Sequence, residues 1–207
     1  MEIKDALAYL SVIANHGDNL RLERIINVPK RGIGATTINA AKEISAALGI
    51  SLFEVFRSAD EYEKLKRSAP KLQEFTSMIE GFAELLARES LSSVFISLLD
   101  ESGYKAMTMA DKEKGEERLQ NLDELNSNLI RFKEENPEGE LSDFLEEVAL
   151  LTDIDNYNAD SDTVVMMTLH ASKGLEFPVV FIPGMEEGVF PGMQSLYDSS
   201  EIEEERR

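Results

Sequence analysis

The sequence predicts a mainly α protein with a small C-terminal α/β piece. Apolar residues recur at intervals of three and four through most of the first 151 positions, a pattern typical of amphipathic helices. Two short apolar runs, residues 164–169 and 179–182, lie near the C-terminus on either side of a polar loop. Runs this short predict two strands of a parallel sheet, each buried on both faces.

Composition is consistent with a soluble, cytoplasmic protein. The chain has 207 residues, of which 43% are hydrophobic, enough for a real core. It has no cysteine, which excludes disulfides, and with only two histidines a structural zinc site is not expected. No apolar run approaches the roughly 18 residues that a membrane span needs. We therefore expect no membrane contact.

The formal charge of −19 argues by itself against binding to nucleic acid. The charges are unevenly distributed, however. Acidic residues concentrate in the middle and the C-terminal tail, while Arg21, Arg24, Lys30 and Arg31 cluster early. Any DNA contact should therefore be small and local.

The first two predicted helices cover residues 2–14 and 19–27. In the first, Ile3, Ala6, Leu7 and Leu10 share one face. The turn between the helices contains His16, which we interpret as an ordinary loop residue because no catalytic partner is nearby in the sequence.

The next stretch, Val-Pro-Lys-Arg-Gly-Ile-Gly from residue 28, precedes a predicted helix over residues 36–48. A helix, a Gly-x-Gly turn and a second helix are typical of a helix-hairpin-helix-like element, whose amides can meet a DNA phosphate while Lys30 and Arg31 add charge. The alternative is a tight turn with Ile33 in the core and two solvated cations. The residues alone leave both interpretations open.

Further amphipathic helices follow, and we assign their apolar stripes to the core. They are predicted over residues 51–57, 70–88, 91–99, 113–132 and 141–151, with Ser-Gly-Tyr at 102–104 closing the third. Residues 152–162 are rich in Asp, Asn and Ser and predict a surface linker. This helical block contains no catalytic constellation.

The polar loop at residues 170–176 reads His-Ala-Ser-Lys-Gly-Leu-Glu. Its Lys supplies a point charge, its Gly allows close backbone approach, and its Glu can accept hydrogen bonds from a ribose. These residue types suit a ligand with phosphate and sugar groups, or a nucleic-acid backbone. A plain connection between two strands is the alternative.

Residues 168–181 closely resemble motif V of the UvrD/Rep/PcrA-type superfamily 1 DNA helicases. The resemblance continues through residues 184–191 and into residues 203–207, which look like the opening of motif VI. The Pro-x-Arg-Gly-Ile-Gly stretch, the Ser-Gly-Tyr and the Arg-x-x-Asn-Leu-x-Glu-Leu at 118–125 are also similar to that family. Gly192 departs from it, because the family often has a basic residue or His there.

This resemblance implies part of an ATP-dependent 3′-to-5′ DNA helicase that acts in repair or replication. It implies that residues 1–15 enter from subdomain 2A, 16–152 form the helical subdomain 2B, 153–162 are a linker, and 163–207 return to 2A. The α/β piece would then belong to an incomplete RecA-like domain. The implied partners are the junction of duplex and single-stranded DNA, the remaining helicase domains 1A, 1B and 2A, and repair or replication proteins.

The resemblance also implies functional residues. It assigns Gly174 and Glu176 to ATP, and it assigns Thr168, His170 and Lys173 to single-stranded DNA or its coupling with ATP. The duplex-DNA residues it implies are Lys30, Arg31, Gly32, Ile33, Gly34 and Thr37. No metal-binding residue is expected.

The full-length enzyme would need ATP and Mg²⁺, but this chain should not hydrolyse ATP alone. The phosphate-binding pattern Gly-x-x-x-x-Gly-Lys-[Ser/Thr] is absent from the sequence, as are the acidic Asp-Glu-x-Gln pattern and the motif VI arginine. We expect no cofactor in the isolated fragment. Two alternatives remain: an acidic helical module for protein interaction or regulation, and the equivalent segment of a helicase–nuclease.

Overall fold

The structure is a computed structural model, and it describes residues 1–155, 164–168, 172, 177–186, 188 and 202. The chain divides into two compact units, Met1–Asn156 and Tyr157–Arg207. Within the described residues, no helix is long and apolar enough to cross a membrane. The mainly α prediction is confirmed for the described part of the chain.

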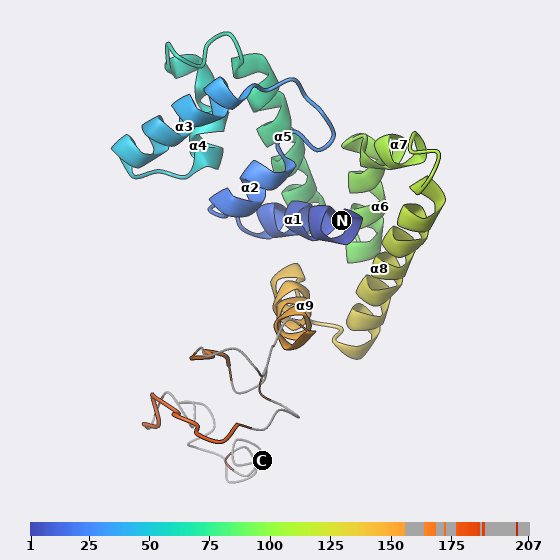
Figure 1. Cartoon of the computed structure of the whole chain (residues 1–207). Coiled ribbons are helices and arrows are strands. Elements are labelled where there is room, and N and C mark those ends of the chain that lie inside the picture. The colour runs from blue at the N-terminus through green and yellow to red at the C-terminus, as the bar shows by residue number, and fades with distance from the viewer. Residues whose placement is uncertain (156–163, 169–171, 173–176, 187, 189–201, 203–207) are drawn as a thin grey trace. The chain divides into compact units, whose positions relative to one another are not determined.

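The first unit is built from helices joined by short turns (Figure 1). They are α1 Glu2–Ala14, α2 Asn19–Ile25, α3 Ala35–Leu48, α4 Leu52–Arg57, the 3₁₀ helix η1 Ala59–Glu61, α5 Ala69–Leu85, α6 Leu91–Glu101, α7 Tyr104–Met109, α8 Gly115–Glu135 and α9 Leu141–Asp155. Sequence periodicity predicted all of them except η1 and α7.

Helix α1 is the central element of this unit. It packs against α2, α5, α8 and α9, and Tyr9, Leu10 and Val12 on it are almost fully buried. Burial on nearly every side explains why its sequence is so apolar for a helix of 13 residues. The sequence placed a subdomain boundary near residue 15. By packing, α1 belongs to the same compact unit as the helices that follow.

Large aromatic side chains fill the core between the helices. Phe53 and Phe56 of α4, Phe75 of α5 and Phe95 of α6 are each at most 1% exposed. Helix starts and stops agree with local chemistry: the Ser90 hydroxyl accepts a hydrogen bond from the Ser93 N–H at the start of α6. Gly49 ends α3 in the left-handed conformation that glycine tolerates best.

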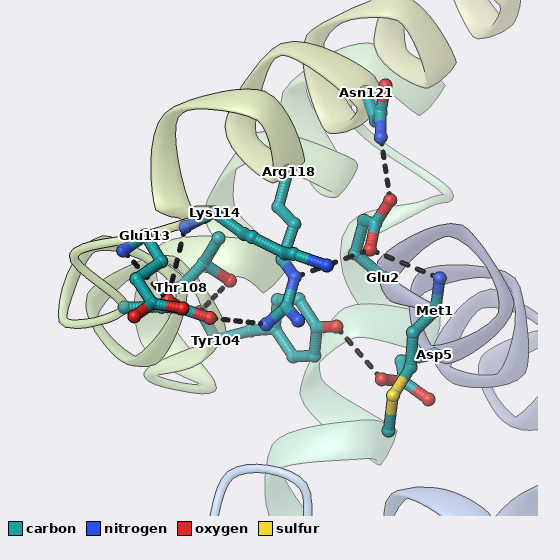
Figure 2. A network of polar contacts seen from close by, with 10 residues as sticks. Met1, Glu2, Asp5, Tyr104, Thr108, Glu113, Lys114, Arg118 and Asn121 are labelled. Carbon is teal, nitrogen blue, oxygen red and sulfur yellow. Dashed lines mark hydrogen bonds and ion pairs between the residues drawn. The ribbon is translucent and has the colours of Figure 1, made fainter.

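A polar network joins the first turn of α1 to α7 and α8 (Figure 2). Asn121 Nδ2 donates to Glu2 Oε1 over 2.7 Å, and the Tyr104 hydroxyl donates to Asp5 Oδ2 over 3.0 Å. Arg24 Nε donates to the other carboxylate oxygen of Asp5 over 2.7 Å. The Ser-Gly-Tyr and Arg-x-x-Asn stretches therefore have a packing role in this unit.

The prediction that Ser-Gly-Tyr simply closes a helix was incomplete. Gly103 adopts a left-handed φ of 77°, which ends α6 and lets α7 begin at the next residue. Helix α7 is only six residues long, too short for a periodic apolar stripe to be visible in the sequence. Its Tyr104 is buried, and the Tyr104 ring meets the Tyr9 ring edge to face at 6.4 Å between centroids.

The two buried parallel strands expected at residues 164–169 and 179–182 are not confirmed. The described residues of both runs form no strand, and their apolar side chains are exposed: Val164 is 93% exposed and Phe181 is 88% exposed. A strand is buried on both faces only where neighbouring strands pair with it and helices cover it. The described residues supply no such neighbours for these two runs.

Candidate nucleic-acid interface

The turn between α2 and α3 is held in one conformation by a side-chain clamp. Asn27 Nδ2 donates to the Ile33 carbonyl over 2.6 Å, and the Ile33 N–H donates to Asn27 Oδ1 over 3.2 Å. Ile33 itself is 4% exposed and belongs to the core. The turn is therefore anchored at its apolar residue, and the two flanking glycines face outward.

The two glycines have different roles. Gly32 has a φ of 68°, a left-handed conformation that other residues adopt only with strain. Gly34 is the N-cap of α3 in extended conformation, and open space surrounds the position where a Cβ would stand. Among the described residues, no side chain caps α3, so the first amides of that helix are presented at the surface next to Gly34.

The start of α5 lies beside this turn. The Thr37 and Ser68 hydroxyls are 3.1 Å apart, and Ser68 is the N-cap of α5. The Lys71 ammonium lies over the turn, since a Cβ added to Gly32 would come within 3.1 Å of Lys71 Nζ. Two segments separated by more than thirty residues in sequence therefore form one surface.

Basic side chains surround this surface. Lys30, Arg67 and Lys71 are all exposed, and no ion pair to an acidic residue is found for them within the described residues. Other exposed cations nearby are paired, as Lys66 is with Glu63. On a chain with a formal charge of −19, this surface is locally positive.

Arg31 departs from its predicted environment. Both terminal nitrogens of its guanidinium point inward and donate to backbone carbonyls and to the Tyr9 hydroxyl. The next residue on each side is exposed, so adjacent positions of the turn face in opposite directions. Neither sequence interpretation, a phosphate contact or a solvated cation, anticipated this inward orientation.

His16 is the other titratable residue near α2. Its ring stacks on Phe53 with centroids 4.1 Å apart, and its buried Nε2 has no hydrogen-bond partner among the described residues. Burial is the main reason that the pKa of His16 is lowered from 6.5, helped by Arg57 and opposed by Glu80. This environment is that of a packed side chain.

Comparison with known proteins decides the family. The family model described as the UvrD-like helicase C-terminal domain matches residues 1–207. The chain belongs to the UvrD-like helicase C-terminal domain family. No group of three or more potential metal ligands occurs within the described part of this UvrD-like chain.

Relatives of this UvrD-like chain include named helicases. It is 39% identical to the ATP-dependent DNA helicase PcrA of Bacillus subtilis, 39% to DNA helicase II of Salmonella typhimurium and 40% to a probable DNA helicase II homolog of Rickettsia conorii. Each comparison covers the whole of this chain but only 29%, 29% and 32% of the respective relative. The chain therefore spans about a third of the length of the relatives it matches.

The structure of this UvrD-like chain describes only some of the motif V residues. Thr168 is described and exposed, and its carbonyl accepts a hydrogen bond from the Ser172 N–H over 3.2 Å. Gly174, Glu176, His170 and Lys173 lie outside the described residues. Their assignment to ATP and to single-stranded DNA stays a prediction.

Sequence reasoning missed Arg67 and Lys71. They precede and begin a helix that the sequence marked only as an amphipathic core element. The sequence signal that could have pointed to them is Lys-Arg-Ser shortly before Pro70. It places cations at a helix start, where the helix dipole disfavours positive charge.

Proposed function

We propose that this chain is the 2B region, with adjoining 2A segments, of an ATP-dependent 3′-to-5′ DNA helicase. Its part in that enzyme is to hold duplex DNA next to the single-stranded junction. The observation that carries this proposal is the surface formed by the Gly32–Gly34 turn and the start of α5, where exposed cations adjoin uncapped helix amides.

The chemistry of this surface suits a phosphate backbone. Amides at the start of α3 can donate to phosphate oxygens, and Gly34 leaves room for a close approach. Lys30, Arg67 and Lys71 supply exposed positive charge, which attracts phosphates whatever the base sequence. The proposed contact is therefore independent of sequence, as an enzyme that moves along DNA requires.

Its strength should depend on salt. A surface that neutralises about three phosphates predicts a slope of about −2.7 in a plot of log affinity against log salt, or about a 40-fold loss between 50 and 200 mM. The acidic remainder of the chain repels DNA, which confines binding to this surface.

The rest of the function lies in the intact enzyme. We propose that Gly174 and Glu176 form one wall of the ATP site, and that Thr168, His170 and Lys173 link it to single-stranded DNA. The phosphate groups and Mg²⁺ would be held by domains 1A and 2A of the intact enzyme. The helicase relatives are about three times as long as this chain, which leaves room for such domains. ATPase activity by this chain alone is not expected.

The proposal is tested by binding of the 207-residue chain to a fluorescent duplex with a single-stranded 3′ tail. The variant K30A/K71A is compared with K4A/K112A, which removes the same charge from two exposed lysines elsewhere. We expect K30A/K71A to lose at least about tenfold in affinity and to reduce the salt slope by about 2, with less than about a twofold effect from the control.

Equal losses in the two double variants would contradict a local site and indicate only general electrostatics. Absence of binding by the unaltered chain at low salt would overturn the proposal and favour the protein-interaction alternative.

A further inference from the structure

We propose that Arg31 is a positioning residue that fixes the DNA-binding turn to the helical core and does not itself contact DNA. The inference rests on the proposed function of that turn. Lys30 and Arg31 are neighbours in sequence but have different environments. Lys30 is exposed to solvent, whereas the Arg31 guanidinium donates to backbone carbonyls inside the unit.

The guanidinium closes the end of α2. Arg31 Nη1 donates to the carbonyls of Ile25, Ile26 and Pro29 over 3.0, 3.3 and 3.3 Å. These carbonyls lie at or just beyond the C-terminus of α2, where backbone acceptors lack helical partners and a positive charge is favoured. The side chain thus folds back onto the segment that leads into its own turn.

The other terminal nitrogen reaches two different helices. Arg31 Nη2 donates to the Tyr9 hydroxyl of α1 over 2.7 Å and to the Ser102 carbonyl after α6 over 3.5 Å. The Tyr9 hydroxyl in turn donates to the Val28 carbonyl over 2.5 Å. Burial raises the pKa of the Tyr9 phenol, an effect that Arg31 opposes in part. The phenol therefore stays protonated and can both donate and accept.

Two aromatic rings also lie against the Arg31 guanidinium. The Arg31 guanidinium carbon is 4.9 Å from the centroid of the Phe75 ring of α5 and 5.9 Å from that of the Tyr9 ring. Contacts of this kind favour a flat, weakly hydrated cation. Arg31 therefore joins α1, α2, α5 and the end of α6 directly behind Gly32 and Ile33.

This arrangement requires the shape of arginine as well as its charge. A lysine at position 31 would keep the charge that a phosphate contact needs. Its single ammonium group cannot reach carbonyls on one side and the Tyr9 hydroxyl on the other at the same time. Replacement of Arg31 by Lys therefore distinguishes positioning from direct contact.

The experiment measures two quantities for the 207-residue chain and its variants R31K, R31A and K30A. The first is hydrogen exchange of the buried Ile33 amide, which donates to Asn27, without DNA, and the second is affinity for the tailed duplex. R24A is the matched control, because Arg24 is another α2-region arginine with an internal carboxylate partner, Asp5.

We expect R31K to raise exchange of the Ile33 amide and to lower affinity, each by about tenfold, the effect of losing charge-assisted hydrogen bonds. K30A should lower affinity and leave exchange unchanged. R24A should leave exchange of the Ile33 amide unchanged even if it destabilises the fold. A smaller effect in the same direction is expected for Tyr9→Phe, which keeps the ring and removes the hydroxyl.

The inference is overturned if R31K keeps wild-type exchange of the Ile33 amide, because the turn would then not depend on the guanidinium. It is also overturned if R31K binds DNA like the unaltered chain while R31A does not, which is the pattern of a direct phosphate contact. If the unaltered chain binds no DNA, the proposed function fails. The exchange measurement then still decides whether Arg31 holds the turn.

Discussion

The helical unit and the C-terminal segment differ in how far their apolar side chains are buried, as two phenylalanines show. Phe95 of α6 is fully buried, whereas Phe181 is 88% exposed. Both lie in apolar stretches of similar hydrophobicity. Periodic spacing lets α6 bury one face against α5, α7 and α8. The continuous run at residues 179–182 has no polar face, so it needs cover on both sides, which the described residues do not provide.

The comparison shows that a hydrophobic pattern indicates what kind of cover a segment requires. An amphipathic helix is satisfied by one layer of neighbours, and this chain contains enough helices to supply it. A doubly buried strand requires paired strands and two layers. For residues 164–168 and 179–182, such cover is not found among the described residues.

The largest change in the free energy of unfolding should come from truncating the buried side chain of Phe95. Phe95→Ala should lower the free energy of unfolding by about 3–5 kcal/mol, because it leaves a cavity in the core. The matched variant Phe181→Ala should change it by no more than about 0.5 kcal/mol. Urea titration followed by circular dichroism measures both. Comparable losses would show that Phe181 is packed in solution and would remove the contrast.

A smaller effect should come from the polar network behind α1. Asp5→Ala removes the acceptor for the buried Tyr104 hydroxyl and for Arg24, at a cost of about 2 kcal/mol. The exposed Asp123 is the control, and Asp123→Ala should stay within about 0.5 kcal/mol. If both variants behave alike in urea titration, the network contributes nothing beyond the apolar core.

Helix capping should contribute less again. The Ser90 hydroxyl caps α6, so Ser90→Ala should cost about 1 kcal/mol. Ser127 lies exposed within α8, where its hydroxyl donates to the Asp123 carbonyl, and Ser127→Ala should not destabilise the chain. Thermal unfolding compares the two. A stable Ser90→Ala variant would mean that α6 is held by its buried face alone.

The smallest effect should be the pH dependence of His16. Because burial lowers its pKa below 6.5 in the folded chain, the unfolded chain binds the proton more readily. Its contribution to stability is thus complete above pH 6.5 and is lost as the pH falls through the folded pKa. His16→Phe keeps a ring against Phe53 without titrating.

The free energy of unfolding, measured at pH 7.5 and 5.5, should therefore fall more for the unaltered chain than for His16→Phe. Identical changes in both proteins would show that the His16 environment is solvated.

Most of the helical fold could be predicted from local pattern. Helices α1, α3, α5 and α8 have clear apolar periodicity, and their ends agree with the predicted ones within about three residues. Helix α7 could not be found this way, because six residues carry too little periodicity. The two strands are not confirmed in the described residues, and burial of such runs depends on neighbours that no local pattern reveals.

The candidate site was predictable only as a position along the chain. The Gly-Ile-Gly stretch left two interpretations open, and in the structure Ile33 lies in the core, as the tight-turn alternative had it. The direction of Arg31 depends on Tyr9, Phe75 and Ser102, which are distant in sequence. The contribution of Lys71 likewise depends on α5 folding back beside the turn. Long-range contacts of this kind leave no signal in a local pattern.

We propose that duplex DNA binds the surface formed by the Gly32–Gly34 turn and the start of α5. Hydrogen exchange of the 207-residue chain with and without the tailed duplex tests it most directly. We predict slower exchange at residues 30–37 and 66–72 on adding DNA, reversed at high salt, with no change along α8. Protection along α8 without protection at the turn, or no protection at any salt concentration, would contradict the claim.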